Sequence, residues 1–216
     1  MTKTLRPGLY GMLDLPADSS PQAARRVYEP LFAAGVPAIQ LRMKDAPAAA
    51  MLAVLEELRP LRPPETLLFV NDRLDVALAV RADGVHLGQD DLPLAVARRI
   101  CAECGRPDLL IGISTHNEQQ AAAALQGGAD YIALGPIYAT KSKLNPDPVV
   151  GIERLAALCK SSARPVVAIG GIALEQVAAI VAAGAHCAAI ISAVNHAAEP
   201  RAAASYVQMQ FQRASS

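Results

Sequence analysis

The feature that most limits the fold of this chain is a repeated alternation between short apolar runs and longer segments with helical spacing. The runs occupy positions 9–13, 38–41, 67–70, 84–87, 110–113, 131–134, 166–169 and 188–191. They are largely apolar on both faces and lack strict alternation, which is typical of strands in a parallel sheet covered on both sides. The segments with helical spacing lie at 22–34, 48–59, 94–101, 118–125, 152–160, 174–183 and 198–211, and a short helix is expected at 74–80.

This alternation predicts about eight strand–helix units, the number that closes a (β/α)8 TIM barrel with parallel strands. The alternative is an open doubly wound sheet. That fold usually has a Gly-x-Gly-x-x-Gly turn after its first strand, where this chain has Asp14-Leu15-Pro16. Because 216 residues suit one domain with a full-sized core, we expect a single TIM-barrel domain over residues 1–216.

Charge and cysteine content argue against several kinds of partner. With 20 Lys and Arg against 20 Asp and Glu, no nucleic-acid partner is indicated. The sequence has no signal-peptide core and no uncharged segment long enough to span a bilayer, so we expect a cytoplasmic protein with no membrane partner. Cys101 and Cys104 have redox or metal spacing, but no second pair or nearby His completes a zinc site, and we expect ordinary thiols. The oligomeric state is left open, a homo-oligomer included.

Acidic and amide side chains follow two neighbouring predicted strands. Asn71 and Asp72 follow the third run, and Asp91 follows the fourth. In a barrel these strand ends share one face. Two carboxylates and an amide there suit a hard cation, especially Mg²⁺, which keeps waters and shares the phosphate oxygens of a substrate. The alternative is that Asp72 and Asp91 cap the helices that follow them.

A cationic group is expected on the same face, at the end of the second predicted strand. Gln40, Arg42 and Lys44 would point the same way, because side chains alternate between the faces of a strand. Three inward polar groups are expensive to bury without a ligand or a counter-charge. An Arg and a Lys opposite a carboxylate-bound Mg²⁺ would hold a diphosphate and stabilise charge on a leaving phosphate. The alternative for Arg42 is a structural ion pair with Asp45 or Asp14.

Two further features indicate phosphate binding. Lys143 lies in the longest irregular stretch, 138–150, which we interpret as a mobile loop over the site. Gly170-Gly171, with Ser192 one strand later, resembles the phosphate cradle that follows strands seven and eight in many barrels. Because this cradle is separate from the metal site, we expect two phosphorylated small-molecule substrates.

Hydroxyl and imidazole groups near the fourth and fifth runs are harder to assign. Ser114 could donate to a diphosphate or act as a nucleophile, but no acid–base triad surrounds it in the sequence. Thr115 and His116 are expected to enter the next helix as its cap and first turn, which leaves direct chemistry by His116 as the alternative. His86 lies at a strand end, where we expect it to support the loop.

Several of these motifs together resemble the thiamine-phosphate synthase family. They are QLRMK at 40–44, NDR at 71–73, GVHLGQDD at 84–91, GISTH at 112–116, ADYIALGP at 129–136 and IGGI at 169–172. They occur in order between about Leu9 and Val194, so the resemblance covers nearly the whole chain. It implies a (β/α)8 barrel that joins hydroxymethylpyrimidine diphosphate to hydroxyethylthiazole phosphate, giving thiamine phosphate and diphosphate.

The resemblance also implies roles for individual residues. Asp72 and Asp91 would bind Mg²⁺. Arg42, Ser114 and Lys143 would be the catalytic groups. The pyrimidine diphosphate would be held by Gln40, Arg42, Lys44, Asn71, Ser114 and Lys143. The thiazole phosphate would be held by Thr140, Ser142, Gly171, Ile191 and Ser192. The family more often has a single lysine in this loop, so Lys141 could share or take the role of Lys143.

The implied mechanism is dissociative. Diphosphate leaves the pyrimidine methylene, the electron-rich aminopyrimidine stabilises the cation, and the thiazole nitrogen captures it without a general base. Two alternatives remain at this stage. A thiazole tautomerase of the same superfamily would use His116 as acid–base and need no Mg²⁺, and a non-catalytic barrel would only bind a phosphorylated ligand.

Overall fold

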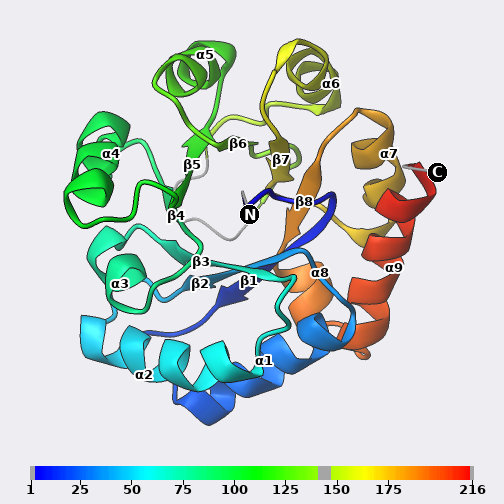
Figure 1. Cartoon of the computed structure of the whole chain (residues 1–216). Helices are drawn as coiled ribbons and strands as arrows, with labels where there is room; N and C mark the ends of the chain where they lie inside the picture. The colour runs from blue at the N-terminus through cyan, green and yellow to red at the C-terminus, as the bar shows by residue number, and fades with distance from the viewer. Residues whose placement is uncertain (1–2, 141–146, 215–216) are drawn as a thin grey trace.

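The computed structural model describes residues 3–140 and 147–214. Within these residues the strands are all parallel and close a barrel in sequence order, because β1 pairs with both β2 and β8 (Figure 1). The strands are β1 (Gly8–Asp14), β2 (Ala38–Arg42), β3 (Leu67–Asn71), β4 (Gly84–Leu87), β5 (Leu110–Thr115), β6 (Tyr131–Leu134), β7 (Val166–Ile169) and β8 (Cys187–Ile190). The predicted TIM barrel is therefore confirmed, and the open doubly wound sheet is wrong.

Helices surround the barrel on its outside (Figure 1). They are α1 (Pro21–Ala33), α2 (Ala48–Leu58), η1 (Arg59–Leu61), α3 (Leu74–Ala79), α4 (Leu94–Glu103), α5 (Glu118–Gln126), α6 (Ile152–Ser161), η2 (Leu174–Gln176), α7 (Val177–Ala182), α8 (Ser192–Asn195) and α9 (Pro200–Ala214). The short helix α8 was not predicted, and β8 ends one residue earlier than expected. In the described part of the chain, no helix has both the length and the apolar character needed to cross a membrane.

Side-chain alternation along the strands sorts the apolar residues into two cores. One core lies between the barrel and the helices and takes residues such as Leu9, Ile39 and Val85. The other contains the inward-facing side chains of the strands, with Leu5 of the N-terminal segment: Leu5, Tyr10, Met12, Ala38, Leu67, Phe69, Tyr131, Ala133, Val167, Cys187 and Ala189. Because both faces of each strand are buried, the strands read as continuous apolar runs rather than as alternating patterns.

Three aromatic rings fill the middle of the barrel. The Tyr10 ring centroid lies 5.5 Å from that of Phe69 and 5.9 Å from that of Tyr131, and Phe69 and Tyr131 are 5.4 Å apart. Two glycines make room for these rings. A Cβ at Gly84 would lie 2.3 Å from a Phe69 ring carbon, and one at Gly112 would lie 2.0 Å from Cζ of Tyr131. The rings form an aromatic layer that separates the two ends of the barrel interior.

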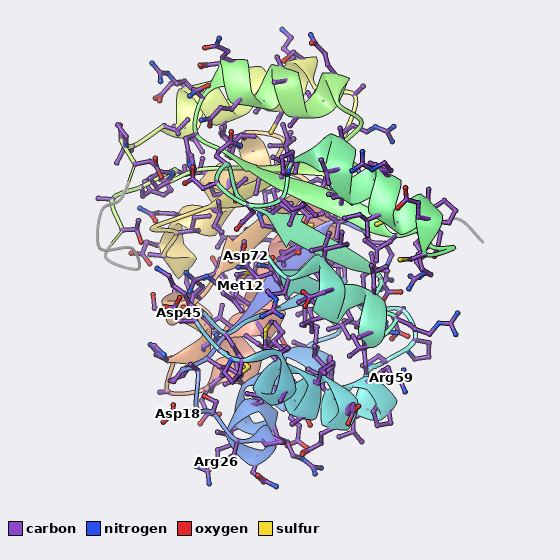
Figure 2. The ribbon with its side chains drawn as sticks, turned by 90° about the vertical axis from the view of Figure 1, so that its left-hand side faces the viewer. Met12, Asp18, Arg26, Asp45, Arg59 and Asp72 are labelled. Carbon is purple, nitrogen blue, oxygen red and sulfur yellow. The ribbon has the colours of Figure 1, made fainter. Side chains whose placement is uncertain are left out.

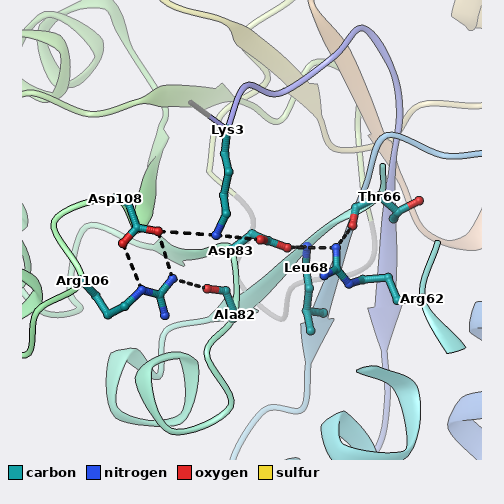
Figure 3. Close-up of polar contacts among 8 residues, drawn as sticks. All are labelled: Lys3, Arg62, Thr66, Leu68, Ala82, Asp83, Arg106 and Asp108. Carbon is teal, nitrogen blue, oxygen red and sulfur yellow. Dashed lines mark hydrogen bonds and ion pairs between the residues drawn. The ribbon is translucent and has the colours of Figure 1, made fainter. Parts of the chain in front are cut away.

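The N-terminal segment covers the barrel at the end where the strands begin. Nζ of Lys3 lies 2.9 Å from Oδ1 of Asp83, and Nη1 of Arg62 lies 3.1 Å from Oδ2 of the same carboxylate (Figure 3). Asp83 also accepts a hydrogen bond of 2.9 Å from the backbone N–H of Leu68. Leu5 is only 7% exposed. This end of the barrel is therefore closed by packing and by a buried carboxylate, which leaves the opposite rim for ligands.

Candidate active site

The predicted site residues gather at the rim where the strands end. Figure 2 shows the barrel from the side, with Asp45 and Asp18 toward the left and Arg59 on the opposite side. β3 ends at Asn71, just before Asp72, and its neighbour β4 is followed by the loop that carries Asp91. The βα loops thus bring together residues that are distant in sequence, as expected for a barrel of this kind.

Asp72 and Asp91 face one another at the rim. Asp72 has a φ of 61°, in the left-handed region that few non-glycine residues adopt. Its backbone N–H donates a 2.8 Å hydrogen bond to the carbonyl of His86, which fixes this turn against β4. Asp91 is held from its own loop, because its Oδ2 accepts a 2.6 Å hydrogen bond from the backbone N–H of Gly88. The backbone of Asp72 and the carboxylate of Asp91 are therefore each fixed by a hydrogen bond to the segment that begins with β4.

The helix-cap alternative for these two residues is wrong. The N-cap of α3 is Arg73 and the N-cap of α4 is Pro93, and neither helix has a side-chain cap hydrogen bond. Asp72 and Asp91 each lie one or two residues too early to cap these helices. Their carboxylates are directed toward each other instead, and a hydrogen bond joins them.

The electrostatics of this carboxylate pair fit a cation. Desolvation, the hydrogen bond with Asp91 and the charge of Asp91 raise the pKa of Asp72 well above its usual range, while the nearby Arg42 lowers it. Asp72 also reaches solvent at the rim, and a cation between the two carboxylates would offset the repulsion that helps to raise this pKa. Among the described residues, no three His, Cys, Asp or Glu side chains form a metal-binding group. Two carboxylates are nonetheless enough for Mg²⁺, which takes its other ligands from water and phosphate.

The two polar residues of β2, Gln40 and Arg42, each have a side-chain partner, whereas Lys44 lies beyond the strand. Nε2 of Gln40 donates a 2.5 Å hydrogen bond to Oδ1 of Asn71, and Gln40 is only 2% exposed. Nη1 of Arg42 lies 2.5 Å from Oδ1 of Asp14, so the ion-pair alternative is confirmed for Asp14. Arg42 still acts on Asp72, whose pKa it lowers. Lys44 was expected to share the direction of Gln40 and Arg42, but β2 ends at Arg42 and Lys44 is exposed in the following turn.

Ser114 is bonded to an imidazole inside the barrel. Its Oγ lies 2.8 Å from Nε2 of His86, and Nδ1 of His86 lies 2.9 Å from the hydroxyl of Tyr131. Burial lowers the pKa of His86 to about 4, so the ring is neutral at pH 7. His86 was expected to support its loop, which is wrong for its side chain because that side chain points into the barrel. The sequence analysis assigned no role to Tyr131. In the barrel, Tyr131 on β6 and His86 on β4 lie in register with Gly112, one on each side of it.

The residues after Ser114 differ from the expected cap. Thr115 is the last residue of β5, and Asn117 caps α5 by accepting a 2.9 Å hydrogen bond from the N–H of Gln120. Nδ1 of His116 lies 2.6 Å from the carbonyl oxygen of Gly135, and its Nε2 lies 3.5 Å from a carboxylate oxygen of Asp147. His116 therefore links two loops, and this geometry gives no special support to the acid–base role of the tautomerase alternative.

The expected phosphate cradle lies across the mouth of the barrel. β7 and β8 are neighbours, opposite β3 and β4 in the closed order (Figure 1). A Cβ at Gly171 would lie 2.4 Å from the carbonyl oxygen of Ala139 and 2.5 Å from that of Tyr138, so only glycine fits this contact. The half-buried Thr140 follows these two residues.

The remaining predicted residues fall into two groups. Ile191 precedes α8, and Ser192 begins it at an exposed position. Lys141, Ser142 and Lys143 lie outside the described residues. All four cysteines are free, and Cys101 is buried while Cys104 is exposed.

Comparison with known proteins gives the same answer from sequence and from structure. The model of a family described as thiamine monophosphate synthase matches residues 15–194. A thiamine-phosphate synthase from Anaeromyxobacter dehalogenans is 46% identical over 207 residues, covering 96% of this chain and 90% of the relative. One from Koribacter versatilis is 42% identical over 189 residues, covering 86% and 88%.

A solved structure agrees with these relatives. The thiamine phosphate pyrophosphorylase from Pyrococcus furiosus superposes with a TM-score of 0.79 at 35% identity, covering 94% of this chain and 96% of that one. The fold, the order of the motifs and identities above 40% over most of both chains lead to one conclusion. This chain belongs to the thiamine-phosphate synthase family.

Proposed function

We propose that this chain condenses 4-amino-2-methyl-5-hydroxymethylpyrimidine diphosphate with 4-methyl-5-(2-hydroxyethyl)thiazole phosphate, giving thiamine phosphate and diphosphate. The observation that carries the proposal is the facing pair of Asp72 and Asp91, with Arg42 close enough to lower the pKa of Asp72. Two carboxylates beside a guanidinium match a diphosphate that is bound together with a divalent cation. The relatives named above carry the same activity in their names.

Asp72 and Asp91 would hold Mg²⁺. When bound, this ion neutralises charge that develops on the leaving diphosphate. Arg42 would stabilise the same charge from its position at the end of β2, fixed by Asp14. Ser114 would donate to the diphosphate, and Lys44 and Lys143 would add positive charge from the loops. None of these groups has to take up a proton, so the chemistry needs no general base.

Gln40 and Asn71 would recognise the pyrimidine. Their mutual hydrogen bond uses one amide N–H of Gln40 and the carbonyl of Asn71. The Asn71 amide also donates to Asp72, so its other N–H and the second N–H of Gln40 remain as donors, and the carbonyl of Gln40 remains as an acceptor. An aminopyrimidine offers the complementary pair, an amino N–H and a ring nitrogen. The electron-rich ring held in this way would stabilise the cation left by diphosphate departure, and the thiazole nitrogen would capture it.

The thiazole phosphate would bind across the mouth. Gly171 lets the loop after β7 pack directly on the carbonyls of residues 138 and 139. Thr140, Ile191 and Ser192, with Ser142, would complete this second phosphate site. A cytoplasmic location and a single domain stay predictions from the sequence, and the oligomeric state stays open.

The first test is a single-pot assay of the purified chain with both substrates, with and without Mg²⁺. Thiamine phosphate and diphosphate should appear in equal amounts and only with the metal. Asp91→Ala should lower this turnover by at least about a hundredfold, as expected for removal of a group that stabilises transition-state charge. Thiazole phosphate binding should be unchanged in this variant.

The adjacent exposed carboxylate offers a matched control. Asp90→Ala removes the same charge one residue away and should retain turnover within about twofold, because exposed charges contribute little. Full activity of Asp91→Ala would remove Asp91 from the metal site. No product from the folded wild-type chain would reject the synthase assignment, and the thiazole carboxylate tautomer would be assayed next.

A further inference from the structure

Four polar side chains form a continuous hydrogen-bonded row inside the barrel. The hydroxyl of Tyr10 lies 2.8 Å from that of Tyr131, which lies 2.9 Å from Nδ1 of His86. Nε2 of His86 lies 2.8 Å from Oγ of Ser114. Tyr10, Tyr131 and His86 are 2%, 1% and 6% exposed, whereas Ser114 is half-buried at the rim. The row therefore runs from the aromatic layer to the proposed diphosphate site.

The row depends on a missing side chain. Gly112 of β5 is in register with His86 on β4 and with Tyr131 on β6. A Cβ at Gly112 would lie 2.4 Å from the hydroxyl oxygen of Tyr131. The Tyr131 hydroxyl thus occupies the space that any other residue at this position would fill, and it reaches past β5 to an imidazole two strands away. The ring packs in the barrel core, and the hydroxyl adds a hydrogen-bonded link from this core to His86 and the rim.

The number of protons sets the direction of the hydrogen bonds. For a neutral imidazole the four groups carry four polar protons and make three bonds with one another. If Tyr10 donates to Tyr131, Tyr131 to Nδ1 and Nε2–H to Ser114, the serine proton remains and faces the site. In the reverse direction the serine donates inward, and the proton of Tyr10 is left over in an apolar core. Among the described residues, Tyr131 is the recorded hydrogen-bond partner of the Tyr10 hydroxyl.

We propose that Tyr131 is a positioning residue that holds His86 as its Nε2–H tautomer, so that the hydroxyl of Ser114 donates outward to the substrate diphosphate. The inward arrangement leaves a buried O–H without an acceptor, which should make the outward arrangement about 5- to 150-fold more populated. An outward O–H attracts an anion, whereas an inward O–H would present oxygen lone pairs to it. This inference rests on the proposed contact between Ser114 and the diphosphate.

The tautomer of the wild-type protein provides the first test, and it requires no active variant. The chain has four histidines, so ¹⁵N-histidine labelling gives a simple spectrum in which the His86 signals are identified by their loss in His86→Gln. Long-range ¹H–¹⁵N correlations distinguish the two neutral tautomers. The expected result is a dominant Nε2–H form. A dominant Nδ1–H form would overturn the proposal.

Diphosphate binding provides the second test, with inorganic diphosphate and Mg²⁺ as the probe in calorimetry. Tyr131→Phe should weaken binding about five- to tenfold and populate both tautomers, because the donor to Nδ1 is lost. Tyr10→Phe is the matched control. It also removes one buried phenol, but the bonds from Tyr131 to Ser114 stay satisfied, so its affinity and tautomer should match the wild type within about twofold.

Ser114→Ala separates failure of the inference from failure of the assignment beneath it. Weaker binding in Ser114→Ala together with wild-type binding in Tyr131→Phe would overturn the positioning role while the Ser114 contact stands. Wild-type binding in Ser114→Ala would overturn the contact itself and the inference with it. Weakened binding in both variants, with a changed tautomer in Tyr131→Phe, would support the proposal.

Discussion

Replacing Gly112 by alanine should disturb both the core and the site. The backbone of Gly112 lies outside the positive-φ region, so alanine meets no backbone strain there. The added Cβ would lie 2.0 Å from Cζ and 2.4 Å from the hydroxyl oxygen of Tyr131, far inside contact distance. The Tyr131 ring also packs against Tyr10 and Phe69, so it must move or distort its neighbours. Its hydrogen bond to His86 should be lost in either case.

The expected loss of stability is the sum of three effects. Overpacking of a rigid core costs about 1–3 kcal/mol. The two hydrogen bonds of the Tyr131 hydroxyl contribute about 1 kcal/mol each. Alanine recovers about 0.4–1 kcal/mol, because it restricts the unfolded chain more than glycine does. We therefore expect a net loss of about 2–5 kcal/mol in the free energy of unfolding, from effects that differ in sign.

Urea denaturation of Gly112→Ala measures this loss directly, with Gly127→Ala as the control. Gly127 also has a negative φ, of −71°, and its Cβ would lie 3.0 Å from the flexible end of Leu94, so about 1 kcal/mol or less is expected. The double variant Gly112→Ala with Tyr131→Leu should be at least about 1 kcal/mol more stable than the sum of the two single losses predicts, because the leucine side chain leaves room for the added Cβ. A Gly112→Ala variant within about 0.5 kcal/mol of the wild type, or strict additivity of the pair, would refute the steric reasoning.

Three further predictions concern the two ends of the barrel. Asp83→Ala should lower the free energy of unfolding, measured by urea denaturation, by about 3 kcal/mol, because it removes the carboxylate partner of the largely buried Arg62. Lys3→Ala removes the more exposed partner of Asp83 and should lower it by less than about 1 kcal/mol. Equal losses in the two variants would contradict this reasoning. The lowered pKa of His86 means that the unfolded chain takes up a proton on His86 near pH 6.5 while the folded chain takes it up near pH 4, so this group lowers the stability as the pH drops between these values. The raised pKa of Asp72 acts in the opposite direction, so the wild type is compared with His86→Gln, relative to which it should lose about 3 kcal/mol over this range; equal pH slopes of the two proteins would reject the burial argument. Gly171→Ala places a Cβ 2.4 Å from a carbonyl oxygen, at a residue whose φ is 68°, so it should weaken the binding of thiazole phosphate. Calorimetry should show unchanged binding of Mg²⁺ and inorganic diphosphate. Equal weakening of both ligands would contradict the proposal of two separate phosphate sites.

The barrel was predictable from the sequence because strands buried on both faces appear as continuous apolar runs. All eight apolar runs became strands, and their order in the closed sheet follows the sequence. Asp72 and Asp91 were predictable for a similar reason, since a carboxylate at a strand end has a position that the fold dictates. The choice between metal ligand and helix cap was not predictable, because both need an acidic residue in nearly the same place. The structure rules out the helix caps, because the N-caps are Arg73 and Pro93, and the metal role stays a prediction.

The errors share a physical cause, which is that period-two reasoning holds only while a strand lasts. Lys44 was aligned with Arg42 on a strand that ends at Arg42. His86 was assigned to its loop because a lone polar residue at a strand end gives no sign of partners two strands away. The signal lay in the register, where Gly112 has His86 on one side and Tyr131 on the other. Register across a barrel is a tertiary property, and single-strand patterns do not contain it.

The aromatic layer has a consequence for the order in which molecules come and go. Tyr10, Phe69 and Tyr131 close the barrel beneath the site, so both substrates and both products use the same mouth. Under the proposed assignment the pyrimidine reaches Gln40 and Asn71, while the thiazole phosphate occupies loops at the entrance. A thiazole seated first would obstruct the deeper position. Because the aromatic layer closes the barrel beneath the site, the two substrates would bind in order, the diphosphate substrate first. The pattern of product inhibition would then reveal this order, which the shape of the barrel imposes.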